Sequence, residues 1–190
     1  MYKGIVFDLD GTLVDSKLCF RTIRKQLGIP EGQWILEYLD QLPRQEKAAK
    51  LAELEQIELQ AARNSDLYAG VLPLLEELRS KRIKLGIFTR NCSSVVRQIT
   101  GKFKMKIDLV VTRDDGPPKP NPAGFKKFLE TWNLMGHELL FVGDVYHDID
   151  CGKQAGVKTA LFTNGNSITN SNLKPDHQIL GYDDFHHCIK

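Results

Sequence analysis

Long apolar runs are missing from this sequence. No window approaches the roughly 18 consecutive apolar residues that indicate a membrane-spanning helix. The N-terminus, Met-Tyr-Lys-Gly, also lacks the cationic lead and apolar stretch of a secretory signal peptide. We therefore expect a cytoplasmic protein with no membrane partner.

Cysteine is scarce and widely spaced. The chain has 4 cysteines, and no two of them form a C-x-x-C pair. This spacing argues against a zinc site and against a disulfide scaffold, so we predict free thiols. They are Cys19, Cys92, Cys151 and Cys188, and Cys92 is expected in the first turn of a helix.

An excess of charge of one sign is also absent. The 26 Lys and Arg residues nearly balance 24 Asp and Glu residues, for a formal charge of +2. Because the basic residues are scattered, the sequence has no electrostatic footprint for a nucleic-acid partner. A length of 190 residues with 42% hydrophobic residues fits one globular domain with a modest insert. The oligomeric state is left open, and a monomer is compatible with the sequence.

Short apolar stretches alternate with amphipathic stretches along most of the chain. This alternation predicts an α/β fold, a Rossmann-like doubly wound parallel sheet with right-handed crossovers. The predicted strands cover residues 4–7, 84–89, 107–112, 138–142, 157–162 and 177–180. The predicted helices cover residues 72–81, 93–101, 124–133, 148–155 and 183–188.

Residues 16–70 have a different texture, with few β-branched runs and apolar residues that recur every three or four positions. This pattern predicts three helices, over 18–27, 33–42 and about 48–61. We expect Trp34 and Leu39 to point inward in the second of them. We interpret residues 16–70 as a small helical cap inserted into a core made of residues 1–15 and 71–190.

Two carboxylates stand at the end of the first predicted strand. Asp8 and Asp10 follow the apolar run 4–7 and precede Gly11. Residues i and i+2 of a strand point to the same side, and ligands of open α/β sheets bind at this edge. Two crowded carboxylates repel each other and favour a divalent cation or a shared proton. Taken alone, Asp-Leu-Asp-Gly also fits an ordinary polar turn.

Polar residues of other kinds mark three further strand ends or loops. Thr89 and Asn91 follow the second core strand, and Lys119 stands between two prolines. Asp144 and Asp148 lie four residues apart at the start of a helix, where acids also stabilise the helix dipole. Together these residues offer carboxylate oxygens for a hard cation, a hydroxyl and an ammonium for an anion, and a spare carboxylate. That combination suits phosphoryl transfer.

These motifs resemble a known family. Asp8-Leu9-Asp10-Gly11-Thr12, Thr89, Lys119-Pro120, and Gly143-Asp144 with Asp148 are similar to the four ordered motifs of the haloacid dehalogenase superfamily. The helical insert resembles the C1-type cap of that superfamily. The pattern of core and cap is most similar to its phosphoglycolate phosphatase-like branch.

The resemblance implies roles for the first motif. Asp8 would be the nucleophile that forms an aspartyl-phosphate, and it would also bind Mg²⁺. Asp10 would be the general acid and then the general base, with its backbone carbonyl on the metal. Thr12 would orient Asp10.

The resemblance also implies roles for the later motifs. Thr89 and Lys119 would bind the phosphoryl group, with Asn91 as a weaker candidate for the same task. Asp144 would bind Mg²⁺, and Asp148 would do so directly or through water. Val145, Tyr146 and His147 are an unusual filling between these acids, and we expect His147 to face solvent rather than substrate.

The function that the resemblance implies is that of a Mg²⁺-dependent phosphatase acting on a small phosphorylated metabolite. The acid at Asp10 argues for an oxygen leaving group, because a halide needs no proton. A sugar-phosphate mutase and a non-catalytic phosphate-binding module are the alternatives. Four basic residues of the cap either meet an anionic end of the substrate or lie on a solvated helix face: Arg21, Arg24, Lys25 and Arg44.

Overall fold

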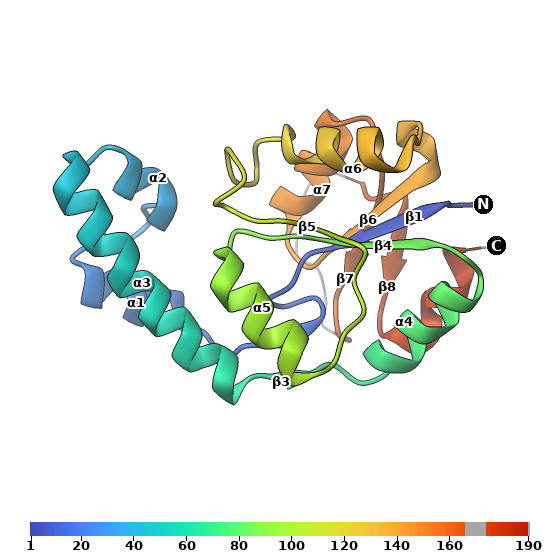
Figure 1. The fold of residues 1–190 in the computed structure, drawn as a ribbon, viewed down its shortest axis with the longest axis horizontal. Coiled ribbons are helices and arrows are strands. Elements are labelled where there is room, and N and C mark those ends of the chain that lie inside the picture. Colours follow the sequence, from blue (N-terminus) through green and yellow to red (C-terminus); the bar gives the residue numbers. More distant parts are fainter. Residues whose placement is uncertain (166–173, 190) are drawn as a thin grey trace.

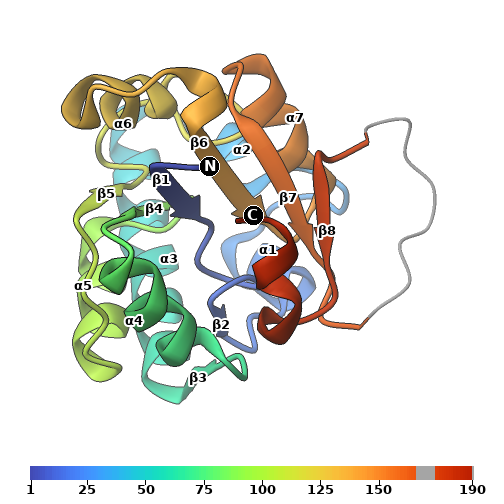
Figure 2. The same ribbon diagram turned by 90° about the vertical axis from the view of Figure 1, so that its right-hand side faces the viewer.

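A six-stranded sheet forms the centre of the molecule. The computed structural model describes residues 1–165 and 174–189, and within them every neighbouring pair of strands in this sheet is parallel. The strand order is β5-β4-β1-β6-β7-β8, and Figures 1 and 2 show the sheet between two layers of helices. The strands are β1 (Gly4–Phe7), β4 (Lys84–Phe88), β5 (Leu109–Val111), β6 (Leu139–Gly143), β7 (Lys158–Phe162) and β8 (His177–Ile179). The predicted Rossmann-like α/β class is confirmed.

Apolar side chains of β1 divide between the two faces of the sheet. All four residues of this strand are buried, because it lies between β4 and β6 in the middle of the sheet. Ile5 and Phe7 join a core cluster under α4, α5 and the C-terminal segment, and Val6 joins a second cluster under α6 and α7. A continuous apolar run is what a strand covered on both faces requires.

The helices that cover the sheet follow the predicted order. They are α4 (Val71–Ser80), α5 (Ser93–Lys102), α6 (Gly124–Trp132) and α7 (Tyr146–Gln154), with 3₁₀ helices at Gly136–Glu138 and Tyr182–His187. Most predicted core elements agree with the structure to within one residue at each end, and three predictions differ more. The strand predicted over 107–112 is limited to β5, the helix predicted over 148–155 begins two residues earlier, and the terminal helix predicted over 183–188 is of the 3₁₀ type.

Three helices form the segment between the first two sheet strands of the sequence. They are α1 (Phe20–Leu27), α2 (Ile35–Asp40) and α3 (Arg44–Asn64), and they lie to one side of the sheet in Figure 1. Their inner side chains make a separate apolar cluster that includes Ile23, Leu39 and Leu54. Of the two positions predicted to point inward, Leu39 is buried, whereas the prediction for Trp34 is wrong, since this residue is 44% exposed. The helical insert is thus confirmed as a set of helices, whereas its exact boundaries as a domain stay a prediction.

A small antiparallel ribbon joins the insert to the core. Its strands β2 (Val14–Asp15) and β3 (Asp66–Leu67) have two residues each, with Val14 opposite Leu67 and Asp15 opposite Asp66. Such short strands carry no readable periodicity, so the sequence did not predict them. The ribbon brings the two ends of the helical segment together.

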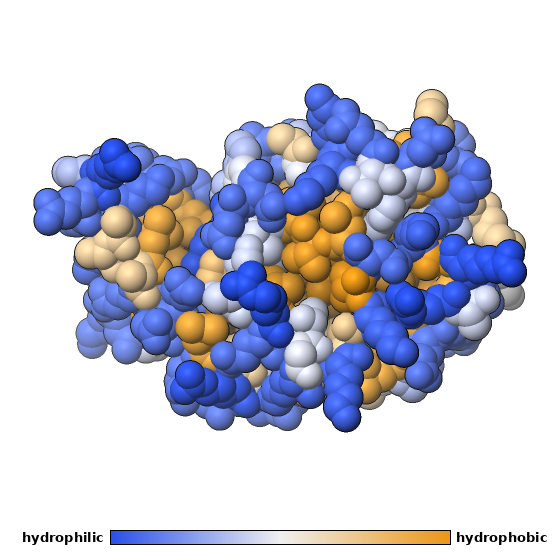
Figure 3. All heavy atoms as spheres, viewed as in Figure 1, coloured by the Kyte–Doolittle hydropathy of each residue, from blue (hydrophilic) through white to orange (hydrophobic). Residues whose placement is uncertain are grey.

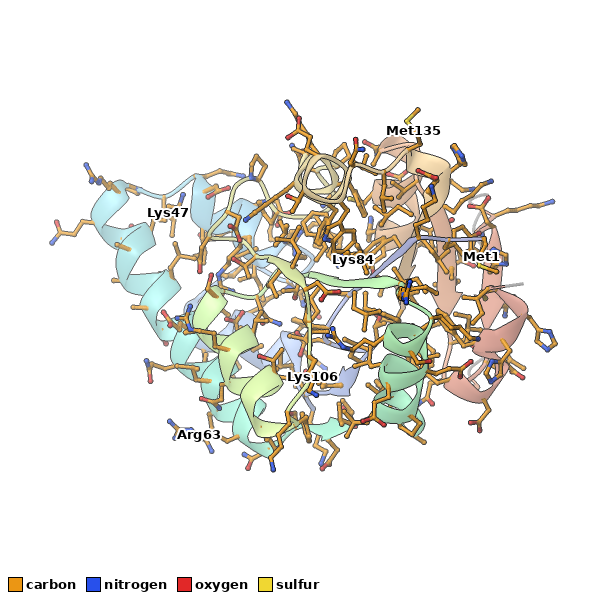
Figure 4. All side chains as sticks on the ribbon, turned by 45° about the vertical axis from the view of Figure 1, so that its right-hand side comes forward. Met1, Lys47, Arg63, Lys84, Lys106 and Met135 are labelled. Atoms are coloured by element: carbon orange, nitrogen blue, oxygen red, sulfur yellow. The ribbon has the colours of Figure 1, made fainter. Side chains whose placement is uncertain are left out.

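The surface carries scattered charge with apolar areas between the charged side chains. Figure 3 shows hydrophilic side chains over most of one face, with apolar areas between them, including one over the middle of the core and one over the helical insert. Leu109 and Val110 of the edge strand β5 are half-buried. Lys47, Arg63, Lys84 and Lys106 lie apart from one another in Figure 4. Among the described residues, no helix has both the length and the apolarity needed to cross a membrane. All four cysteines are free, as predicted.

Candidate active site

The loop after β1 places two carboxylates at the carboxyl edge of the sheet. The Asp8 amide donates to the Val142 carbonyl (2.8 Å), which continues the pairing of β1 with β6 for one residue. The chain then turns at Gly11, whose φ of +78° is a conformation that glycine adopts without strain. A Cβ atom at this position would lie 2.2 Å from Asp144 Oδ2. A glycine is therefore needed for the Asp144 carboxylate to lie against this turn.

Lys119 lies between two carboxylates from different strand ends. Its Nζ is 2.9 Å from Asp8 Oδ1 and 2.6 Å from Asp148 Oδ1. The lysine side chain is only 3% exposed. Burial lowers the pKa of this ammonium, but the carboxylates of Asp148 and Asp8 outweigh that effect and raise the pKa overall. Lys119 is therefore held in its charged form beside Asp8.

Three carboxylates converge around this ammonium. Asp8, Asp144 and Asp148 each offer an oxygen within 4.8 Å of the others. Burial raises the pKa of Asp8 well above its ordinary value, against the opposing effect of Lys119. Burial, and then the charge of Asp148, raise the pKa of Asp144 to about 6. Burial and the neighbouring carboxylates thus both disfavour the charged forms of Asp8 and Asp144.

The donor set fits a divalent hard cation. Three carboxylates and one ammonium leave a formal charge of −2, and oxygen ligands are those that Mg²⁺ prefers. Asp8, Asp144 and Asp148 are the residues that would hold such an ion. A cation there would also offset the burial and the mutual repulsion that raise the pKa values of Asp8 and Asp144.

Asp10 lies close to this cluster but is held by different partners. Asn91 donates a hydrogen bond from Nδ2 to Asp10 Oδ2. Burial raises the pKa of Asp10, while hydrogen bonds with Ser16 and Asn91 act in the opposite direction. Asn91, predicted as a weaker phosphate ligand, is thus engaged with Asp10, and its backbone N–H donates to the Thr89 hydroxyl at 3.2 Å.

Thr12 has a different partner from the one we expected. Its hydroxyl donates to Asp144 Oδ1 at 3.2 Å, so the prediction that it orients Asp10 was wrong. The turn at Gly11 lies against the Asp144 carboxylate, and the neighbouring Thr12 is therefore within reach of Asp144. The Thr12 carbonyl is fixed in turn by the Tyr182 hydroxyl at 2.7 Å.

A cavity of about 470 Å³ opens over these residues, between the sheet edge and the helical insert. Among the predicted site residues, its walls include Asp8, Asp10, Thr89, Asn91 and Asp144. Lys119 and Asp148 join the site through their contacts with each other and, for Lys119, with Asp8. All seven predicted site residues are therefore brought together at one edge of the sheet.

The insert supplies part of the cavity wall. The His147 residue is exposed, as expected, yet it lines the cavity and its ring packs edge-on against Trp34, with 4.6 Å between ring centroids. Of the basic cap residues considered from the sequence, Arg24 lines the cavity. Arg21, Lys25 and Arg44 are exposed.

Two ion pairs between the insert and the core were not predicted. Arg90, which follows Thr89, binds both carboxylate oxygens of Glu37 on α2. Arg113, in the loop after β5, donates to Glu58 Oε1 on α3 at 2.7 Å. No local signal in the sequence marks such pairs, because each joins residues more than 50 positions apart.

The parallel sheet and the acidic cluster at its carboxyl edge define a Rossmann-like α/β enzyme architecture. Residues 5–162 match the family model described as haloacid dehalogenase-like hydrolase. The chain therefore belongs to the haloacid dehalogenase-like hydrolases, the family that the four motifs predicted.

Named relatives lie within the same family. The chain is 32% identical to the phosphoglycolate phosphatase of Aquifex aeolicus, over 92% of this chain and 90% of the relative. It is 31% identical to the pyrophosphatase PpaX of Bacillus velezensis, over 97% and 94% of the two chains. The solved structure of a predicted phosphoglycolate phosphatase from Haemophilus somnus superposes with a TM-score of 0.78 at 25% identity, covering 100% of this chain and 98% of that one.

Proposed function

We propose that this hydrolase is a Mg²⁺-dependent phosphatase that cleaves a small phosphomonoester through an aspartyl-phosphate at Asp8. The observation that carries the proposal is the contact of Lys119 with both Asp8 and Asp148 beside Asp144, next to the cavity that Asp10 lines. The names of the relatives from Aquifex aeolicus and Bacillus velezensis support phosphate chemistry. They do not favour the mutase alternative, which the proposal leaves aside.

Asp8 is the proposed nucleophile. Its carboxylate oxygen forms a bond to phosphorus while the bond from phosphorus to the leaving oxygen breaks. Lys119, 2.9 Å from Asp8 Oδ1, is placed to offset negative charge on the transferred group. The Thr89 hydroxyl lines the same cavity and is a proposed donor to a phosphoryl oxygen.

Asp10 is the proposed general acid and base. Its raised pKa favours the protonated form that the leaving oxygen requires. Having given up this proton, Asp10 takes one from the water that attacks phosphorus in the second step, which releases phosphate and restores Asp8. Asn91 positions the Asp10 carboxylate through its hydrogen bond.

Mg²⁺, held by Asp8, Asp144 and Asp148 and by the Asp10 backbone carbonyl, would supply charge neutralisation for the phosphoryl group. The helical insert, residues 16–70, is the proposed cap, and its residues line part of the cavity.

The proposal is tested by measuring phosphate release from phenyl phosphate and from ethyl phosphate, with Mg²⁺ and with EDTA. We expect turnover with Mg²⁺ that EDTA abolishes. Asp8→Asn is expected to lose at least about 10³-fold in rate while its thermal unfolding stays cooperative. Asp150→Asn is a matched control on α7, because Asp150 bonds Gln154 and is not part of the carboxylate cluster. Full turnover by Asp8→Asn would contradict the proposal.

A further inference from the structure

Glu58 connects the helical insert to the core beside the cavity. It lies on α3, which packs along α5 (Figure 1). Its Oε1 accepts a hydrogen bond from Arg113 Nη1 at 2.7 Å, and the side chains of both residues are 9% exposed. The same Arg113 nitrogen donates to the Arg90 carbonyl at 3.2 Å. The Oε1 end of the carboxylate is therefore fixed.

The second oxygen of this carboxylate is unsatisfied. Glu58 Oε2 is buried and has no hydrogen-bond partner among residues 1–165 and 174–189. A buried acceptor without a partner is costly, and native structures contain few of them. Burial raises the pKa of Glu58 against the opposing effect of Arg113, and the charge of Asp10 raises it further. Glu58 is thus a buried acceptor with one oxygen unpartnered in the part of the chain that the structure describes.

Glu58 also lines the cavity that contains Asp8 and Asp10. The leaving oxygen of a bound phosphomonoester must lie next to Asp10 to receive its proton. Glu58 lines the same cavity, so the alcohol that extends from this oxygen into the cavity has Glu58 in its wall. A hydrogen-bond donor on that alcohol would satisfy Oε2.

Most of the remaining wall near the insert is apolar. Its apolar residues are Leu18, Phe20, Ile23, Trp34, Ile35, Leu36 and Leu54. Two of the cations that line the cavity already have acidic partners: Lys17 pairs with Asp66, and Arg90 pairs with Glu37. Arg24 donates from Nε to the Gln33 carbonyl at 2.8 Å, and its remaining guanidinium nitrogens are the competing site for an anionic group.

We infer that Glu58 is a specificity-determining residue that accepts a hydrogen bond from a hydroxyl or ammonium group on the leaving alcohol. The inference rests on the proposed phosphatase function. The substrate class is a phosphomonoester whose alcohol is largely apolar and carries such a donor close to the ester oxygen. A carboxylate or a second phosphoryl group at that place offers only acceptor oxygens and negative charge to the Glu58 carboxylate, so it is disfavoured.

A size-matched series of esters tests this specificity. The probes are ethyl phosphate, 2-hydroxyethyl phosphate, 2-aminoethyl phosphate and 2-phosphoglycolate, with phosphate release measured as kcat/KM in Mg²⁺. We expect kcat/KM for 2-hydroxyethyl phosphate and 2-aminoethyl phosphate to exceed that for ethyl phosphate by about 10-fold. Ethyl phosphate has no donor for Glu58, so the buried acceptor stays without a partner when this ester binds. We expect kcat/KM for 2-phosphoglycolate to be about 10-fold lower than that for ethyl phosphate.

Glu58→Gln is the direct variant. Its amide oxygen can keep the bond to Arg113, and its NH₂ group then replaces the free acceptor with a donor. In this variant, kcat/KM for 2-hydroxyethyl phosphate divided by kcat/KM for ethyl phosphate is expected to drop to about 1. The kcat/KM for 2-phosphoglycolate is expected to rise. Thermal unfolding of each variant verifies that it is folded. Glu53→Gln is the matched control, because Glu53 lies on the same helix, is exposed, and should keep the wild-type ratios.

Arg24→Gln tests the competing site. If 2-phosphoglycolate is the preferred ester of the wild type and Arg24→Gln removes that preference, the inference is overturned. Unchanged ratios in Glu58→Gln would overturn it as well. Absence of phosphate release from every ester, including ethyl phosphate, would instead contradict the proposed function itself and the inference with it.

Discussion

Arg90 and Glu37 form a two-pronged ion pair that joins the carboxyl end of β4 to helix α2 of the insert. Arg90 Nη1 is 2.9 Å from Glu37 Oε1, and Nη2 is 2.7 Å from Oε2. The guanidinium also lies 5.2 Å from the centre of the Trp34 ring and donates to the Lys119 carbonyl. One side chain thus contacts the insert and the loop that carries the proposed phosphate ligand.

A double-mutant cycle measures this pair. Glu37→Gln, Arg90→Gln and the double variant should give a coupling of about 0.5–1 kcal/mol in urea unfolding, because the two side chains are 43% and 26% exposed. The coupling should fall between 0.05 and about 0.5 M NaCl as the charges are screened. Contacts that Arg90 makes with other groups cancel in the cycle. A coupling of zero at low salt would mean that the pair does not form in solution.

Lys119→Met removes the ammonium between Asp8 and Asp148. Without Mg²⁺, the two buried carboxylates lose their partner, and we expect the free energy of unfolding at pH 7.5 to fall by about 3–5 kcal/mol. We expect kcat/KM to fall by about 10²–10³-fold, because the cation near the transferred group is lost. Urea unfolding and phosphate release measure the two effects.

Lys127→Met is the control for Lys119. Lys127 also forms an ion pair, 2.7 Å from Asp115, but its side chain is 45% exposed. Its loss should cost at most about 1 kcal/mol and leave turnover unchanged. Equal destabilisation by the two variants would contradict the buried position of Lys119.

Asp144→Asn tests how the acidic cluster makes the stability of the protein depend on pH. Burial and Asp148 raise the pKa of Asp144 from 3.8 to about 6. Because the folded protein binds this proton more tightly than the unfolded chain, the stability that Asp144 contributes is present below about pH 4. It is lost as the pH rises to 6. An asparagine has no such loss, so in EDTA the Tm of the variant minus that of the wild type should increase from pH 4 to pH 7, by a few degrees.

Mg²⁺ provides the second half of the Asp144 test. At pH 7.5 the wild type should gain Tm as Mg²⁺ is added, because an ion that binds only the folded state stabilises it. Asp144→Asn should gain less. If the Tm difference between Asp144→Asn and the wild type did not change with pH, and if Mg²⁺ raised both Tm values equally, Asp144 would not be part of the cation site.

The site residues that the sequence predicted are those that lie at or just after the ends of predicted strands. Asp8, Thr89 and Asp144 each follow an apolar run, and a parallel sheet brings the carboxyl ends of neighbouring strands to one edge. Knowledge of the four motifs identified the family, which the family match to residues 5–162 confirms. The catalytic and ligand roles of the individual residues, the domain boundaries and the cytoplasmic location stay predictions.

Contacts between segments that are distant along the chain could not be predicted from the sequence. Trp34 was predicted inward from helical spacing, but it lies against His147 and Arg90 of the core. The Thr12 hydroxyl was assigned to Asp10, although the turn at Gly11 carries it to Asp144. Helical periodicity reports which face of a helix is apolar, and it does not report which element covers that face.

Trapping the phosphorylated enzyme tests the central claim most directly. The wild type, mixed with Mg²⁺ and phenyl phosphate and quenched in acid within milliseconds, should carry the mass of one phosphoryl group on the peptide that contains Asp8. Asp10→Asn should accumulate more of this species, because Asp10 activates the water that removes it, and Asp8→Asn should carry none. A wild type that releases phosphate without any phosphorylated Asp8, or with the group on another residue, would contradict the account.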